Sequence, residues 1–149
     1  MQAQIQTLKH DTELLNFIYQ NARMGITGIN QIRSCIKDMN FLNLLNTQYA
    51  QYDNFAVQAE SALRDLGEKS KDISPAAKAG SFISSKCNTA VDSTVSHLAE
   101  MMIEGTCMGI TKLQQKVNAM QDCTQQYKDI AQQLIDFENK SIEDLKQFL

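Results

Sequence analysis

The chain has 149 residues, which is enough for one domain with a sizeable core that needs no disulfide or metal to hold it together. Its net charge of −3, without clustered Lys and Arg, argues against nucleic acid or an anionic membrane as a partner. One Pro, no Trp and 43% hydrophobic residues favour a soluble, all-helical chain.

The N-terminal residues lack the pattern of a secretory signal, and no segment has the roughly 18 consecutive apolar residues of a membrane helix. We therefore predict a cytoplasmic protein. The cysteines at positions 35, 87, 107 and 123 form no CxxC pair. In that compartment they are expected to stay reduced and to act as small buried hydrophobic residues.

Apolar residues spaced three and four apart predict two long helices in residues 11–67. The first helix is expected to begin near Asp11 or Thr12, and Gly67 suits the end of the second. A short turn near residues 37–40 makes them an antiparallel hairpin. The first apolar seam comprises Leu15, Ile18, Ala22, Gly25, Ile29, Ile32 and Ile36, and the second Leu42, Leu45, Tyr49, Tyr52, Ala56, Ala59, Leu63 and Leu66.

Residues 68–88 contain Ser74-Pro75 and several Gly and Ser residues, and they predict a crossover. Residues 89–149 then predict a second hairpin, with a joint near residues 119–124 placed by analogy with the first. Its seams comprise Val95, Leu98, Met102, Thr106, Gly109, Leu113 and Met120, followed by Tyr127, Ile130, Leu134, Phe137, Ser141, Leu145 and Phe148.

The tetrapeptide MGIT occurs at residues 24–27 and again at 108–111, with matching helical phase on both sides. This repeat predicts one all-α domain over residues 1–149, a four-helix bundle of two duplicated hairpins joined by a crossover. Gly25 and Gly109 occupy equivalent mid-helix positions, where each costs about 1 kcal/mol relative to Ala. We expect close helix packing there, or room for a large neighbouring side chain.

The sequence contains none of the motifs GxGxxG, GxSxG or HExxH and no Walker loop, so we lean towards a protein that is not an enzyme. His97, Glu100 and Glu104 lie at i, i+3 and i+7 and share one helical face, a pattern that can supply metal ligands. Their stripe is rotated about 100° from the core seam, which favours a solvated face instead.

Two further clusters are candidates. Tyr49 and Tyr52 fall on the inner seam near Glu60, and buried tyrosines need hydrogen-bond partners, so an inner polar network is expected there, with Asn21 or Gln48 as other partners. Cys107 and Cys35 would form a redox pair if their Cβ atoms came within about 4.5 Å.

The segment SHLAEMMIEGTCMGI, residues 96–110, resembles one found in a group of small bacterial proteins with a ferritin-like four-helix bundle. That resemblance implies a fold in which ferritin-like enzymes bind two metal ions through Glu residues and two Glu-x-x-His motifs. The chain has no Glu-x-x-His, and His97-x-x-Glu100 reverses the order. The fold is therefore expected to carry over without the di-iron chemistry.

Our leading interpretation is a non-enzymatic structural or protein-interaction role without a cofactor, with a homodimer as a possible assembly and the protein partner unknown. Its self-association face would comprise Phe17, Met24, Phe41, Ile103 and Ile110, with a wider core as the alternative place for some of them. The alternative is a degenerate ferritin-like protein that binds iron or another divalent metal. Its ligands would be His97, Glu100 and Glu104 with Glu13, Glu60 or Glu138.

Overall fold

The computed structural model describes residues 1–73 and 94–149. These residues form four helices and no strand, so the prediction of an all-α chain is confirmed. The elements are α1 (Gln2–Ile32), the short 3₁₀ helix η1 (Arg33–Cys35), α2 (Met39–Asp65), α5 (Val95–Ala119) and α6 (Gln125–Lys146). Most of the predicted crossover, residues 68–88, lies outside the described residues.

The start of α1 differs from the prediction, because the helix begins at Gln2 and not near Asp11. The Asp11 carboxylate does not cap α1. It accepts hydrogen bonds from the backbone N–H and the hydroxyl of Thr124, at 2.7 and 2.6 Å, across the bundle. With no Gly or Pro before it, the chain continues the helix through residues 2–10.

The other helix ends follow local chemistry that the sequence shows. Asp38 caps α2 by accepting from the backbone N–H of Phe41, and Thr94 caps α5 in the same way. Gly67, just after α2, adopts a φ of 76°, in the left-handed region that glycine favours. The joint between α5 and α6 spans residues 120–124, where the hairpin analogy predicts it.

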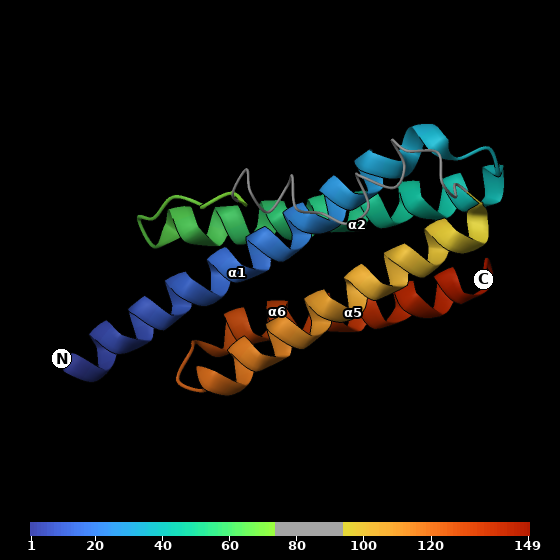
Figure 1. Ribbon diagram of the computed structural model, residues 1–149. Helices are drawn as coiled ribbons and strands as arrows, with labels where there is room; N and C mark the ends of the chain where they lie inside the picture. The colour runs from blue at the N-terminus through green and yellow to red at the C-terminus, as the bar shows by residue number, and fades with distance from the viewer. Residues whose placement is uncertain (74–93) are drawn as a thin grey trace.

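The four helices pack as two antiparallel hairpins, α1 with α2 and α5 with α6 (Figure 1). Between the hairpins, α1 packs beside α5 and α2 beside α6, again with opposite directions. The end of α2 and the beginning of α5 lie at opposite ends of the molecule (Figure 1). None of the helices in the described residues is long and apolar enough to span a membrane.

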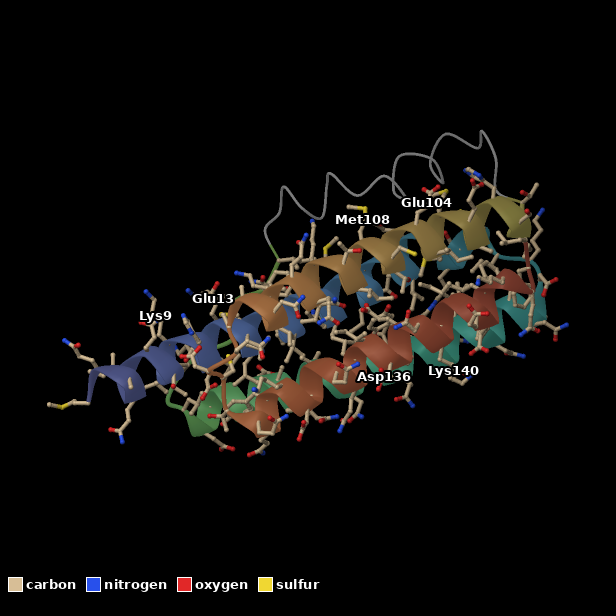
Figure 2. The ribbon with its side chains drawn as sticks, turned by 90° about the horizontal axis from the view of Figure 1, so that it is seen from below. Lys9, Glu13, Glu104, Met108, Asp136 and Lys140 are labelled. Atoms are coloured by element: carbon tan, nitrogen blue, oxygen red, sulfur yellow. The ribbon has the colours of Figure 1, made fainter. Side chains whose placement is uncertain are left out.

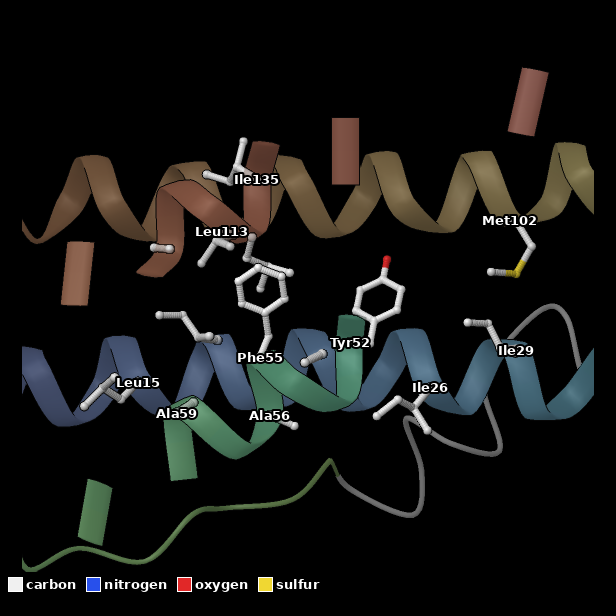
Figure 3. Close-up of a cluster of buried hydrophobic side chains, with 14 of the residues drawn as sticks. Leu15, Ile26, Ile29, Tyr52, Phe55, Ala56, Ala59, Met102, Leu113 and Ile135 are labelled. Carbon is white, nitrogen blue, oxygen red and sulfur yellow. The ribbon is translucent and has the colours of Figure 1, made fainter. Parts of the chain in front are cut away.

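The apolar seams of all four helices meet along the bundle axis and form one core (Figure 3). Removing these aliphatic and aromatic side chains from water is the main force that holds the hairpins together. Fully or nearly fully buried members include Leu15, Ile18, Ala22, Ile29, Leu45, Ala59, Leu63, Leu98, Leu113, Leu134 and Leu145.

The residues expected to form a self-association face lie mostly in or against this core. Phe41 is completely buried, with its ring centroid 5.1 Å from that of Phe148, so it widens the core and does not belong to a self-association face. Phe41 and Leu45 are four residues apart and therefore lie on the same face of α2, which is directed towards the core. Phe17, Ile103 and Ile110 are partly buried and pack against the core, whereas Met24 is 38% exposed.

Polar contacts fasten the N-terminal half of α1 to the second hairpin. Besides the Asp11–Thr124 pair, His10 Nδ1 lies 2.6 Å from Asp122 Oδ1, and Lys116 of α5 pairs with Glu13. His10 therefore belongs to a continuous helix and has a partner across the bundle.

Candidate functional site

A small polar cluster lies inside the bundle, formed by residues from three helices. Glu138 of α6 is 2% exposed. Its Oε1 accepts a hydrogen bond from the Tyr52 hydroxyl of α2 at 3.3 Å. Its Oε2 accepts from Asn21 Nδ2 of α1 at 3.5 Å, and the same nitrogen donates to the backbone oxygen of Gly109 at 3.2 Å. The cluster thus links both hairpins through their interior.

The two glycines of the repeated MGIT segment make room for this cluster. A Cβ atom at Gly25 would lie 2.5 Å from Cζ of Tyr52, a distance that van der Waals radii forbid. A Cβ atom at Gly109 would lie 3.2 Å from Asn21 Nδ2 and 3.3 Å from Glu138 Oε1. Gly25 therefore admits the Tyr52 ring, and Gly109 brings the α5 backbone against side chains of α1 and α6.

A cavity of about 110 Å³ adjoins the cluster and lies between the hairpins. Its walls combine the polar groups with glycine backbone and methionine side chains. The described residues that line it are Asn21, Met24, Gly25, Gly28, Tyr52, Met102, Gly105, Thr106, Gly109 and Glu138. The cavity is partly open to the surface, and Met24 is an exposed member of its lining.

The Tyr52 side chain is held rigidly in this position. It rises from α2 with its hydroxyl directed towards α5 (Figure 3). Its ring meets that of Phe137 edge to face, with 4.9 Å between the centroids. An aromatic pair of this geometry contributes about 0.5–1.5 kcal/mol beyond its buried area. The donor that faces Glu138 is therefore preorganised.

Burial raises the pKa of Glu138 to about 8, although the hydrogen bonds from Tyr52 and Asn21 act in the opposite direction. Among the described residues, no Lys or Arg forms an ion pair with this carboxyl group. Burial, followed by the charge of Glu138, also raises the pKa of Tyr52 well above its usual value. At neutral pH Glu138 is consequently mostly protonated, and Tyr52 keeps its proton.

The predicted metal ligands lie elsewhere, on α5. His97 Nδ1 is 3.4 Å from Glu100 Oε2, and Glu104 is exposed on the outer side of the helix (Figure 2). Within residues 1–73 and 94–149, no three His, Cys, Asp or Glu side chains gather closely enough to hold a metal ion. The metal site stays a prediction, and the geometry supplies it with no third ligand.

The inner network expected at Tyr49, Tyr52 and Glu60 forms around Tyr52 with Glu138, and Asn21, one of the alternative partners expected from the sequence, joins it through Glu138. Tyr49 is half-buried, with the guanidinium of Arg33 4.8 Å from its ring centroid. Glu60 is half-buried and takes no part in the hydrogen bonds that join Tyr52 to Glu138.

The sequence suggests Asn21 as a partner of the inner tyrosines and Glu138 as an alternative metal ligand, but it does not predict the contact between them. A signal for Glu138 was present, because it lies four residues after Leu134 and three before Ser141, which are both seam positions. A carboxyl group at core spacing indicates a buried acid. Its partners could not be read from the sequence, because they come from two other helices.

The sequence predicts that all four cysteines stay reduced. This prediction is wrong, because Cys35 is disulfide-bonded. Cys107 is free and exposed, so the proposed Cys35–Cys107 pair is wrong. Cys123 is free and buried, and desolvation raises the pKa of its thiol to about 11. Cys87 lies outside the described residues. Disulfides are typical of oxidising compartments, so the cytoplasmic location stays a prediction.

Comparisons with protein-family models, curated proteins and solved structures found no match to this chain. The ferritin-like resemblance thus remains a prediction from the segment at residues 96–110.

Proposed function

We propose that this protein is a non-enzymatic four-helix bundle that binds a small ligand in the cavity beside Glu138. The observation that carries the proposal is the combination of a cavity open to the surface with a buried, uncharged carboxyl group in its wall. Pockets that pair apolar walls with a few convergent polar groups and a shifted pKa are the usual form of small-molecule sites.

The features that form the cavity lower the stability of the fold, and this cost supports a binding role. The two glycines that make room for the cluster, Gly25 and Gly109, each cost about 1 kcal/mol relative to Ala in a helix interior. The buried acid adds to that cost at neutral pH, as the unfolded chain would ionise it freely. Natural proteins retain such features mainly at functional sites.

The arrangement of the helices fits the ferritin-like architecture that the resemblance implies, and we include that architecture in the proposal. Because α2 ends and α5 begins at opposite ends, the chain needs one long crossover between its hairpins. The proposed site differs from a di-iron centre, because its polar groups are one carboxyl, one phenol and one amide.

The other two functions predicted from the sequence receive less support. Most of the apolar residues expected on a protein-interaction surface lie in or against the core, and Met24 is the exposed member of that set. The metal-binding alternative has the His97–Glu100 pair without a third ligand in the described chain. Both stay predictions.

Methionine methyl groups offer a direct test of ligand entry. Met24 and Met102 line the cavity, whereas Met1 and Met39 are exposed elsewhere. In protein labelled with [¹³C-methyl]methionine, we expect acetamide, a small neutral probe, to shift the Met24 and Met102 signals saturably. The Met1 and Met39 signals should not move.

A variant with a filled cavity provides the control. Thr106 is buried in the wall, so Thr106→Leu places additional carbon in the cavity and should abolish the shifts of the lining methyl groups. If acetamide moved no lining methyl in the wild-type protein, or moved all seven methionine signals alike, the proposed function would be wrong.

A further inference from the structure

The cavity wall has hydrogen-bond acceptors to spare and few free donors. Asn21 Nδ2 donates to Gly109 and Glu138, and the Tyr52 hydroxyl donates to Glu138. The Thr106 hydroxyl donates to the backbone oxygen of Met102 at 2.7 Å. These donors are used within the protein.

The unused hydrogen-bonding sites of the cavity wall are acceptor sites on oxygen atoms. Once Glu138 ionises, its carboxylate has about four lone-pair sites, and the hydrogen bonds from Tyr52 and Asn21 fill two of them. The hydroxyl oxygens of Tyr52 and Thr106 each keep lone pairs as well, since their hydrogens are directed at other acceptors. A ligand rich in N–H donors therefore complements this wall.

The charge of the cavity favours the same ligand. The described residues that line it include one acid and no base. An ionised carboxylate at 2% exposure is strongly unfavourable without a cation, whereas a cation placed against it in a region of low dielectric constant is held firmly. The missing counter-charge can come from a ligand.

Size limits the ligand further. A dry engineered cavity of about 150 Å³ holds benzene, so 110 Å³ accommodates a molecule of only a few non-hydrogen atoms. Met24, Met102 and the glycine backbone provide apolar surface for a short carbon chain.

We propose that the cavity takes a short primary alkylammonium ion, with its three N–H groups donating to Glu138, Tyr52 and Thr106. The alkyl group lies against the methionine side chains. This assignment rests on the proposed function, and it names the chemical class of the ligand.

Binding of such an ion is coupled to the release of a proton. Glu138 has a pKa of about 8 in the free protein, so about nine-tenths of it is protonated at pH 7 and must ionise to hold the cation. The titratable group that faces it is Tyr52 on α2, while α1 and α5 present Asn21, Thr106 and Gly109, which do not titrate. The apparent affinity should rise about tenfold from pH 6 to pH 7 and level off above pH 8.

Calorimetry with ethylammonium chloride and the full chain tests the assignment. Titrations at pH 7 in phosphate and in HEPES, which differ in ionisation enthalpy, should show release of about 0.9 proton per bound ion. Glu138→Gln keeps the size of the side chain and should weaken binding at least tenfold, with no proton release. Glu143→Gln removes the same charge from an exposed position of α6 and should leave both quantities unchanged.

Tetramethylammonium carries the same charge without N–H donors and should not compete. If ethylammonium bound without proton release, or bound Glu138→Gln as tightly as wild type, the assignment would be overturned, and the proton measurement needs no variant. If acetamide shifted the lining methionine signals but ethylammonium did not bind, the ammonium assignment would fall and the proposed function would stand. Failure of both probes would overturn both.

Discussion

Glu138 shows how one residue can combine a structural cost with a chemical use. Its carboxyl group lies on the core side of α6, with only 2% of the residue exposed. Burial keeps it protonated at neutral pH, and Tyr52 and Asn21 provide hydrogen bonds at 3.3 and 3.5 Å. Replacing it should therefore change stability in a way that depends on pH.

The folded pKa of Glu138, about 8, lies above the value of 4.5 for an unperturbed Glu. Between these values the folded state holds a proton that the unfolded state releases, so this residue makes folding less favourable as pH rises from 4.5 to 8. Glu138→Gln cannot ionise. We expect its free energy of unfolding to match wild type within about 1 kcal/mol at pH 5 and to exceed it by roughly 3–5 kcal/mol at pH 8.5.

Urea unfolding followed by circular dichroism at both pH values measures this difference. Glu143→Gln serves as the exposed control and should show no such divergence. A gap between Glu138→Gln and wild type that stayed constant with pH would mean that Glu138 is ionised in the fold.

At the scale of helices, α1 connects the two hairpins. Its apolar face packs against α2, and Asn21 reaches α5 and α6. Its N-terminal half holds the turn before α6 through Asp11. Two substitutions separate the packing contribution of α1 from its polar contribution.

Gly25→Ala should destabilise the bundle, although Ala is the better helix former by about 1 kcal/mol. The new Cβ would meet three atoms of the Tyr52 ring at 2.5–2.7 Å, and that ring is fixed by Glu138 and Phe137. We expect a net loss of roughly 1–3 kcal/mol in urea unfolding. In a Tyr52→Leu background the loss should shrink or reverse, and an unchanged loss there would show that the ring is not the obstacle.

Asp11→Ala should cost roughly 2–3 kcal/mol, because it removes two charge-assisted hydrogen bonds from a residue that is 4% exposed. Thermal unfolding measures the effect. Asp122→Ala, which breaks the neighbouring exposed contact with His10, is the matched control and should cost less. Equal losses would contradict the importance that we give to burial at Asp11.

At the scale of the whole molecule, the helices were predictable because apolar spacing of three and four is a local property. The seams of Leu15 to Ile32 and of Leu45 to Leu63 are buried apart from Gly25 and Tyr49, which are half-buried, and the α5–α6 joint falls at residues 120–124. The extension of α1 to Gln2 was not predicted, since the sequence does not show that Asp11 contacts Thr124 instead of capping the helix.

The candidate site was less predictable, because it depends on how four helices meet. Gly25 and Gly109 were recognised as positions of close packing, and the structure gives each a defined neighbour. Glu138 resembled an ordinary acid of a polar helix, and the His97 stripe attracted attention through its residue types alone. The spacing from Leu134 and Ser141 indicated a buried acid at Glu138, but its partners depend on the packing of α6 against α1 and α2.

The titration of the Glu138 side-chain carboxyl by ¹³C NMR tests the central claim most directly. Comparison with Glu138→Gln assigns its signal. The account predicts a pKa of about 8 in the free protein and a lower value when ethylammonium is added. A Glu138 signal that titrated near 4.5, together with the exposed glutamates and without response to ethylammonium, would contradict it.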